Sequence, residues 1–418
     1  MSTPVASTTP AGLPVASNPG AARALGIGIA GIAATVLGVF VSGIHIVATA
    51  WLVGVSYWTA MAIGMLMIVL IHHIFDAMWT TVVRRQFEHG LAAFKWLALM
   101  FVPLIVITWV GPRDAVWPWM NPAHLMMPKD ITVGADVDYA KKSILLNFRT
   151  FIVLTALFYG IWIWLSARLR KASFSQDFDG DPKWTTKNRI TAAMGIPLTA
   201  MALTFAAILW IKSLEYHWFS TIYGVWYFAN CMRGAYSMGV LIMLWLWYRG
   251  DYKGILHEDH WHSIGQMMLT FTVFWGYIAF SQYFLIWNAN VPEETFWYNL
   301  REYGDWWWVG MVLVFCHFLV PFLALLSYRF KVTHSAIRRI ALWILGVIFI
   351  DICWNILPAM KDAQGHPLPF LSLNLVWAAT STIGVGGVCI WAYLRSFATT
   401  ALIPIRDPRI VESLTHYD

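Results

Sequence analysis

Long apolar runs alternate with short polar segments along most of the chain, and each run is close to 20 residues long. An α-helix rises about 1.5 Å per residue, so about 20 apolar residues cross a hydrocarbon core about 30 Å thick. The pattern therefore predicts an all-α, polytopic membrane protein with about ten transmembrane helices. Their expected limits are 24–50, 57–82, 91–111, 143–167, 190–211, 222–248, 263–288, 305–328, 336–358 and 371–395.

The segments outside these runs are too short to bury the core of a further domain. Residues 1–22 are rich in Ser, Thr, Pro, Ala and Gly and are predicted to be a disordered tail. A secretory signal would need a stronger basic start and a cleavage site, so we expect the first apolar run to be retained as a helix. Residues 23–397 then form one helical bundle, and residues 398–418 form a cytoplasmic C-terminal tail.

The composition excludes a soluble protein. The chain is 59% hydrophobic and 12% charged, whereas a soluble protein carries about 25% charged residues. Many of its 26 Trp lie where an apolar run meets a polar loop, which is the depth of the lipid headgroups. The net charge of +6 is small and follows from basic loops, so we do not expect a nucleic-acid partner.

Lys and Arg are concentrated in alternate loops. If the N-terminus is cytoplasmic, the even-numbered loops and the C-terminal tail hold most of them. Cytoplasmic loops are enriched in Lys and Arg, so both termini are expected to be cytoplasmic. The polar turn 212–224, between the fifth and sixth runs, then faces the other side of the membrane.

The cysteines indicate no cofactor held by this chain. All four lie inside apolar runs, and the sequence has no CxxC or CxxCH spacing. We therefore expect no c-type haem, no iron–sulfur cluster and no zinc or other metal ion. A haem b would need two facing histidines at matched depth, and His317 has no evident partner.

Ionisable side chains inside the apolar runs are candidates for a proton pathway, because they are costly in a membrane. They are His72, His73, Asp76, Arg233, His317 and Asp351, and Glu215 and His217 follow in the turn 212–224. Their expected depths run from the cytoplasmic face through the midplane to the outer face. We predict that His72, His73 and Asp76 share one helix face and load protons, that His317 bridges, and that Asp351, Glu215 and His217 release protons outside.

Structural interpretations of the same residues stay open. His72, His73 and Asp76 would then lock helix packing, and His317 would be a packed interior histidine. Arg233 would be the partner of one buried acid, and Asp351 would pair with Arg233 or with Lys212.

The turn 212–224 is also a candidate quinone site. A quinone head needs polar partners at interfacial depth beside an apolar wall. Glu215 and His217 are the expected polar pair, and Trp218 and Phe219 are the expected wall.

Several segments resemble one family. Residues 213–224, SLEYHWFSTIYG, resemble the S-L-E-P-H-W-F-S-T-x-Y-G signature of the ActF subunit of bacterial alternative complex III. Residues 280–294, FSQYFLIWNANVPEE, are similar to its F-S-Q-x-x-x-I-W-x-x-N-x-P-E-E segment. Residues 317–322 and 351–354 match two further stretches, and a bundle of ten helices fits the related NrfD and polysulfide-reductase membrane subunits. Tyr216 departs from the signature, which has Pro there, and Arg233 and Leu209 also depart from the family pattern.

The resemblance implies a membrane subunit of a quinol oxidoreductase in the bacterial cytoplasmic membrane, in a respiratory or photosynthetic chain. Such a complex passes electrons from the quinol pool to an extracytoplasmic acceptor. Partner subunits carry the c-type haems and iron–sulfur clusters: a multihaem cytochrome, an iron–sulfur protein and an ActC-like quinol-binding subunit. This chain would contribute no catalytic residue of its own, and it would support proton translocation, a second quinone or menaquinone site, or both.

Two other functions fit the residues. A stand-alone proton-coupled transporter would also need many spans and buried charges, although such proteins often have internal repeats that are not evident here. A purely structural assembly subunit would tolerate replacement of the buried acids and histidines.

Overall fold

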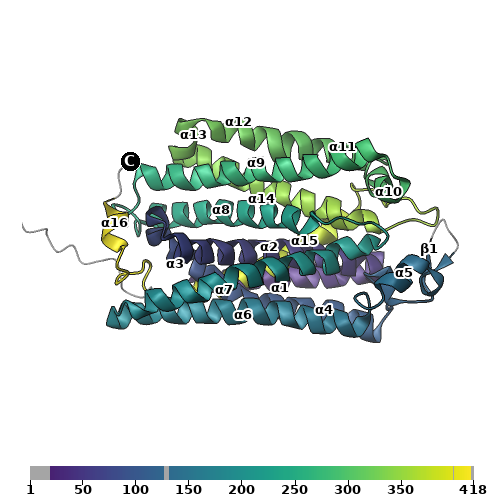
Figure 1. Cartoon of the computed structure of the whole chain (residues 1–418), viewed down its shortest axis with the longest axis horizontal. Helices are drawn as coiled ribbons and strands as arrows, with labels where there is room; N and C mark the ends of the chain where they lie inside the picture. Colours follow the sequence, from purple (N-terminus) through teal and green to yellow (C-terminus); the bar gives the residue numbers. More distant parts are fainter. Residues whose placement is uncertain (1–18, 127–130, 399, 416–418) are drawn as a thin grey trace, which may run out of the picture.

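The computed structural model describes residues 19–126, 131–398 and 400–415. Long helices lie side by side along one direction and form a single bundle (Figure 1). Within the described residues, nine helical segments are long and apolar enough to cross a membrane. The chain is therefore an all-α, multi-pass membrane protein, as its apolar runs predicted.

The helices of the first half are α1 Pro19–Ser42, α2 Ile44–Phe75, α3 Thr81–Gly90, α4 Phe94–Val110, α5 Val137–Lys142, α6 Phe148–Asp179 and α7 Lys183–Ala206. Those of the second half are α8 Tyr223–Arg249, α9 Glu258–Ala289, α10 Pro292–Arg301, α11 Trp306–Val312, α12 Val320–Leu326, α13 Tyr328–Val332, α14 His334–Ile356, α15 Leu373–Phe397 and α16 Ile410–Leu414. Two short antiparallel strands, β1 Leu125–Met126 and β2 Ile131–Thr132, lie in the loop before α5.

The expected sixth span, 222–248, forms α8, which is not among the nine segments that are apolar enough to cross a membrane. This helix of 27 residues packs against α2, α7, α9 and α14. Its lower hydropathy reflects the polar side chains that it directs into the bundle, including Asn230 and Arg233.

The first turn lies earlier than predicted. We expected a first span 24–50 and a second span 57–82, but the chain turns at Gly43, where φ is +84°. Glycine adopts positive φ without steric cost, so a single residue can end α1 and start α2. The apolar sequence is nearly continuous across this turn, and therefore hydropathy alone misplaced it.

The segment after α2 is also different from the expectation. The expected cytoplasmic loop at 83–90 is instead helix α3, and all ten of its residues are buried. Arg84 and Arg85 are 2% and 0% exposed. A cytoplasmic loop would expose both side chains, but they lie inside the bundle.

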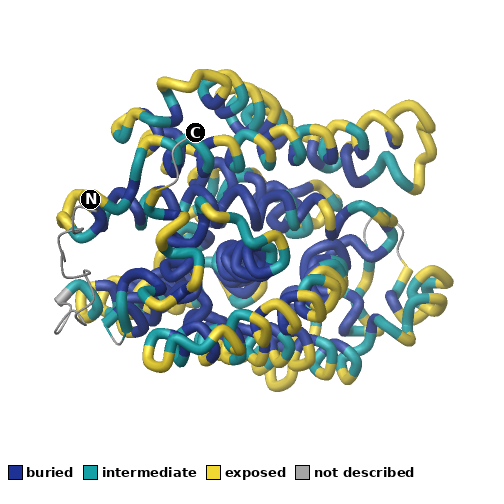
Figure 2. Tube along the Cα trace, turned by 60° about the vertical axis from the view of Figure 1, so that its left-hand side comes forward, coloured by how far each residue is buried: buried dark blue, intermediate teal, exposed yellow. Residues whose placement is uncertain are grey.

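Helix α2 forms the middle of the bundle, and most of its residues are buried. Figure 2 shows the buried segments in the centre and the exposed segments around them. Helices α1 and α15 pack closely through glycines: a Cβ on Gly31 would lie 2.6 Å from the backbone nitrogen of Gly384. Small residues allow such close helix pairs in membranes.

The bundle has two distinct ends. Figure 1 places α16 and α13 at one end, and α5, α10 and the β-hairpin at the other, so we call them the α16 end and the α5 end. Of the expected tail 1–22, residues 1–18 lie outside the described residues, and α1 already begins at Pro19. In the expected C-terminal tail, Leu402 and Ile403 are buried against the bundle.

Candidate functional site

A chain of fully buried polar side chains joins α8 to α14 and to the helix that contains His317. Arg233, His317 and Asp351 are each 0% exposed, and Asn230 is 2% exposed. Buried polar groups need hydrogen-bond partners, and here they find them in one another. The structure thus brings together three of the predicted pathway residues.

His317 is held by Arg233. Arg233 Nη1 lies 2.9 Å from His317 Nε2, and Arg233 Nη2 donates to the His317 carbonyl at 2.7 Å. A guanidinium can only donate hydrogen bonds, so Nε2 must accept. In this arrangement His317 is neutral, with its proton on Nδ1.

Asn230 lies between His317 and Asp351. Asn230 Nδ2 donates to Asp351 Oδ2, and Asn230 Oδ1 lies 3.3 Å from His317 Nε2. Both atoms of the second contact are acceptors while His317 is neutral, so a hydrogen bond between them needs a proton on Nε2. His317 Nε2 and Asp351 Oδ2 are themselves 4.0 Å apart. Asp351 therefore has Asn230 as its direct partner rather than Arg233 or Lys212.

The chain continues from Asp351 toward the α5 end. Asn355 Nδ2 donates to the Asp351 carbonyl at 2.8 Å and to Asp351 Oδ1 at 3.3 Å. Tyr223 OH donates to Asn355 Oδ1 at 2.9 Å, and Arg301 Nη2 donates to the Asn355 carbonyl at 3.0 Å. Tyr223 begins α8, so these contacts carry the polar chain from the bundle interior to the end of a helix.

A π-helical segment, Leu313–Leu319, positions His317 between α11 and α12. Such π-bulges often occur at functional sites because they rotate a side chain out of the regular helical register. Pro321 has no N–H, so it cannot donate the bond that an α-helix would direct to the His317 carbonyl. That carbonyl is the one that Arg233 contacts.

The predicted proton-loading group has a different geometry from the one expected. His72 and His73 are buried near the end of α2, but Asp76 lies beyond the helix in a left-handed conformation with φ of 51°. Its carboxylate pairs with Arg189 and with Arg409. The three side chains therefore do not form one helical face.

His72 belongs to a separate ionic cluster at the α16 end. Its Nε2 lies 2.7 Å from Arg84 Nη1, and Arg84 also pairs at 2.9 Å with both Glu88 and Asp407. Arg85 Nη2 pairs with Asp177 at 2.7 Å. Among the described residues, no hydrogen bond joins this cluster to His317.

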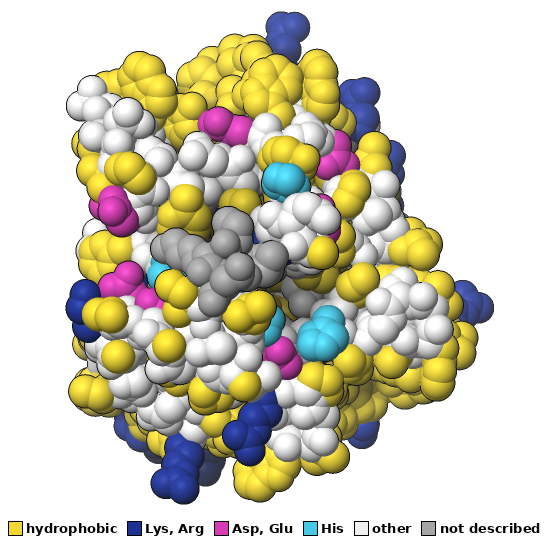
Figure 3. Space-filling view, turned by 90° about the vertical axis from the view of Figure 1, so that its right-hand side faces the viewer, with side chains coloured by type: hydrophobic (Ala, Val, Ile, Leu, Met, Phe, Trp, Pro, Cys, Tyr) yellow, Lys and Arg dark blue, Asp and Glu magenta, His cyan; other side chains and the backbone are white. Residues whose placement is uncertain are grey.

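A large cavity opens at the α5 end. It has a volume of about 1020 Å³ and is lined by Glu215 and His217 of the turn and by Lys361. Glu215 Oε1 pairs with Lys361 Nζ at 2.8 Å. Figure 3 shows acidic and histidine side chains on this face of the molecule.

The expected wall of the quinone site is divided. Trp218 is 0% exposed and stacks on Trp297, with ring centroids 4.2 Å apart. Phe219 is 61% exposed. The turn thus directs Glu215 and His217 to the cavity but directs Trp218 into the core, so the four residues do not enclose one pocket.

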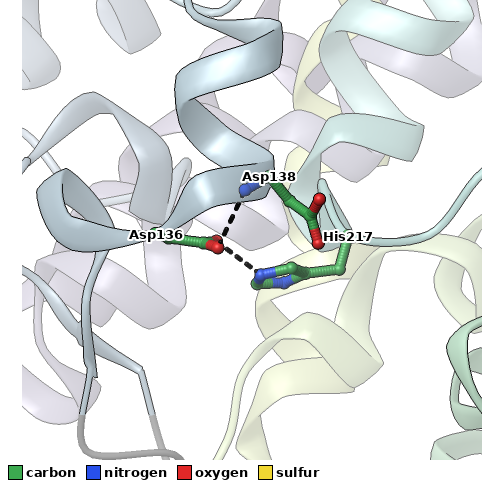
Figure 4. A group of neighbouring side chains, drawn as sticks. All are labelled: Asp136, Asp138 and His217. Atoms are coloured by element: carbon green, nitrogen blue, oxygen red, sulfur yellow. Dashed lines mark hydrogen bonds and ion pairs between the residues drawn. The ribbon is translucent and has the colours of Figure 1, made fainter.

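His217 lies beside two acids, Asp136 at the N-cap of α5 and Asp138 within α5. Asp136, Asp138 and His217 each offer one potential metal-ligand atom, and these atoms lie within 4.8 Å of one another (Figure 4). Partial desolvation would raise the pKa of Asp136, but hydrogen bonds from Tyr216 and from the N–H of Asp138, together with His217, hold that pKa below its ordinary value.

No family model matches the chain, and no curated protein matches it. The likeness to the ActF subunit therefore rests on the sequence motifs alone. The geometry of the polar chain and of the cavity does not depend on that likeness.

Two groups of residues gave no functional signal in the sequence. Asn230 and Asn355 are uncharged and were not considered, although both bridge the charged residues. An apolar cavity of about 410 Å³ between α2, α8 and α15 is lined by Trp58, Met65 and Trp245, among others. Apolar residues in an apolar protein carry no signal that could have separated this lining from ordinary packing.

Proposed function

We propose that this protein is the ActF-like membrane subunit of a quinol oxidoreductase complex, and that its buried polar chain moves protons toward the α5 end. The α5 end would face the outside of a bacterial cytoplasmic membrane, and both termini would be cytoplasmic. In this arrangement α8 would also cross the membrane, so that with the nine segments described above there would be ten spanning helices.

The observation that carries the proposal is the continuous contact from Arg233 through His317, Asn230 and Asp351 to Asn355. These side chains are titratable or can donate and accept hydrogen bonds. They lie where a purely structural core would place apolar residues. Ionisable groups within spanning segments are functional candidates by default.

His317 would act as the switch of this chain. When neutral, its Nε2 accepts a hydrogen bond from Arg233. A proton arriving on Nε2 would repel Arg233 and turn the imidazole into a donor toward Asn230 Oδ1 and Asp351. An imidazole can accept a proton on one ring nitrogen while it keeps the other N–H, which suits such a relay.

Release would follow from Asp351. A proton received by its carboxylate would pass along Asn355 and Tyr223 by way of water, and then to the cavity where Glu215 and Lys361 meet. Two buried atoms, His317 Nδ1 and Arg233 Nε, have no hydrogen-bond partner among the described residues. Buried polar atoms of this kind are commonly satisfied by water, which the relay would require.

Loading from the cytoplasm would begin at the α16 end. His72, His73 and Asp76 are the groups predicted for it, and His73 Nε2 is buried without a partner among the described residues. Water would have to connect His73 to His317, because the two histidines lie in separate polar clusters.

The redox cofactors would belong to partner subunits. In this proposal a multihaem cytochrome and an iron–sulfur protein dock at the α5 end, and an ActC-like subunit oxidises quinol. This chain would then be the part of an oxidoreductase that holds no haem or iron–sulfur cluster. The segments 112–142 and 288–305, the second of which contains α10, would contact those partners.

A quinone or menaquinone site is a second candidate function, favoured by the apolar cavity rather than by the turn. A pocket of about 300–1000 Å³ with apolar and aromatic walls is typical of small-molecule sites. The cavity of about 410 Å³ falls in this range, and its Trp and Met lining suits an isoprenoid chain.

Purification of the chain from its native membrane in mild detergent tests the proposal. Co-purification with multihaem and iron–sulfur subunits, together with quinol oxidation, is the expected result. A chain that purifies alone and catalyses proton-coupled solute uptake would instead support the transporter alternative and contradict the proposal.

A further inference from the structure

We infer that Asp136, Asp138 and His217 form a binding site for a divalent transition-metal ion, with Zn²⁺ as the ion whose ligand preferences fit best. The three ligand atoms already lie within 4.8 Å of one another (Figure 4). Zn²⁺ binds imidazole nitrogen and carboxylate oxygen at about 2.0–2.2 Å, so modest side-chain movements would complete the site. Three protein ligands leave a further position for water.

The fold holds two of the ligands in place. Asp136 precedes α5 and caps it: Oδ1 accepts from the N–H of Asp138 at 3.0 Å. Asp136 Oδ2 accepts from Tyr216 OH at 2.6 Å and lies 2.6 Å from His217 Nε2. Lys142 Nζ donates to the Tyr216 carbonyl at 2.6 Å and fixes the end of α5 to the turn.

Tyr216 is the orienting partner that metal-ligating carboxylates usually have. Its hydroxyl donates to Asp136 Oδ2, and its ring lies 4.2 Å from that of His217, centroid to centroid. Tyr216 also stands where the resembled family has Pro. The hydrogen bond that orients Asp136 is therefore tied to a departure of this chain from the family signature.

The third ligand is free to move. Asp138 is 52% exposed, and its ion pair with Lys141, at 3.2 Å, is exposed to solvent. Exposed ion pairs of this kind contribute little stability. Asp138 and His217 also line the cavity of about 1020 Å³, so water can reach the remaining coordination positions.

The ion would take the place of a hydrogen atom between two ligand atoms. Without metal, Asp136 Oδ2 and His217 Nε2 share a hydrogen bond at 2.6 Å. His217 would coordinate the ion through Nε2 as a neutral imidazole with its one proton on Nδ1: an imidazolium releases one proton to solvent, and a neutral ring only moves its proton from Nε2 to Nδ1. The two ligand atoms would separate to about 3 Å or more as both coordinate the ion. No oxidation or reduction is involved.

The site would fasten the loop that contains α5 to the turn 212–224. Asp136 and His217 are 81 positions apart in sequence, which is why no ligand spacing was visible there. The inference does not depend on proton transfer, since neither Asp136 nor Asp138 belongs to the chain from Arg233 to Asn355.

Isothermal titration of the purified full-length protein with ZnCl₂, and separately with MgCl₂, tests the inference. We expect one Zn²⁺ bound per chain and no comparable Mg²⁺ binding. Asp138→Asn and Tyr216→Phe should each raise the Kd about 10-fold or more, and His217→Gln should abolish tight binding. Asp181→Asn is the matched control, because Asp181 forms an exposed ion pair with Lys183 at the other end of the bundle.

Two results would overturn the inference. One is the absence of Zn²⁺ binding, and the other is an affinity that Asp138→Asn leaves unchanged, which would place the ion elsewhere. Asp138 is exposed, so this variant is informative even if His217→Gln fails to fold. The visible absorption of bound Co²⁺ gives a second readout, and its spectrum should change in Asp138→Asn but not in Asp181→Asn.

Discussion

Arg233 holds His317 in its neutral form, because it donates a hydrogen bond to His317 Nε2. A fully buried guanidinium is costly unless it is paired, and its partners here are an imidazole and a carbonyl rather than a carboxylate. The ring of Trp275 lies 5.6 Å from the guanidinium carbon and adds a cation–π contact. This incomplete neutralisation is what would let a proton on His317 displace Arg233.

Lys212 offers a residue-scale test of the electrostatics at the α5 end. It is 8% exposed, and burial, followed by the nearby charge of Lys142, lowers the pKa of Lys212 to about 8. An unfolded lysine titrates near 10.4, so between about pH 8 and 10.4 the unfolded state binds more protons than the folded state. The contribution of Lys212 to the free energy of unfolding therefore rises with pH across that window. Below about pH 8, burial of the charged Lys212 destabilises the folded state by its full amount.

We predict that Lys212→Met raises the free energy of unfolding at pH 7, by at most about 3 kcal/mol, and has a much smaller effect at pH 10. Thermal unfolding in detergent at the two pH values measures this. Lys253→Met, in an exposed loop position, serves as the control and should change little at either pH. Equal shifts of Tm at pH 7 and pH 10 for Lys212→Met would contradict the assignment.

At the scale of elements, the contact between α1 and α15 depends on glycines. A Cβ on Gly31 would lie 2.6 Å from the nitrogen of Gly384, whereas a Cβ on Gly26 would meet nothing within 4 Å. Both glycines are inside the same helix, so they form a matched pair.

We predict that Gly31→Ala destabilises the protein by about 1–3 kcal/mol, because the helices must separate. Gly26→Ala should be neutral or slightly stabilising, since alanine favours helix over glycine by about 1 kcal/mol. Thermal unfolding in detergent compares the two variants. A Gly31→Ala protein as stable as Gly26→Ala would mean that the close approach of α1 and α15 is wrong.

The helices could be predicted where the pattern of residues within one segment determines them. Apolar runs of about 20 residues cross a membrane as helices, and the spans from α8 onward were found within a few residues. Helix α6 continues to Asp179, beyond the expected end at 167, and α7 begins at Lys183, before the expected start at 190, because both helices extend into polar sequence that hydropathy does not count. The turn at Gly43 was missed because a break of one glycine leaves the hydropathy unchanged. Helix α3 was missed because Arg84 and Glu88 neutralise each other inside the bundle, which a count of charges cannot detect.

The candidate site was predictable only in part. Charged and imidazole groups in apolar runs singled out Arg233, His317 and Asp351, but in one set with His72, His73 and Asp76, which the structure places apart from them. Their pairing through Asn230 depends on how the helices are rotated, and no local pattern encodes that rotation. For the same reason the group around Asp136, which requires a loop to fold onto a distant turn, left no signal in the sequence.

At the scale of the whole molecule, the two ends differ in chemistry. The α16 end contains the arginine-rich cluster around Arg84, and the α5 end contains the acid-lined and histidine-lined cavity. The distribution of Lys and Arg predicts that the α16 end is cytoplasmic.

A fusion at the C-terminus tests this orientation. We predict that a C-terminal green fluorescent protein, which becomes fluorescent in the cytoplasm, is fluorescent in bacteria that express the chain. A C-terminal alkaline phosphatase, which is active only outside the cytoplasm, should be inactive. The opposite pair of results would reverse the direction of the proposed proton path.

The central claim is that the polar chain through Asp351 moves protons. Asp351→Asn keeps the size of the side chain and one acceptor oxygen for Asn230 Nδ2, but it removes the titratable group. The decisive measurement is the ratio of protons released to electrons transferred, in sealed vesicles that contain the assembled complex. Asp181→Asn, at a partly exposed position between α6 and α7 and away from the polar chain and the cavity, is the matched control. We predict that Asp351→Asn retains electron transfer and loses most proton release while the control retains both; an unchanged ratio in Asp351→Asn would contradict the account.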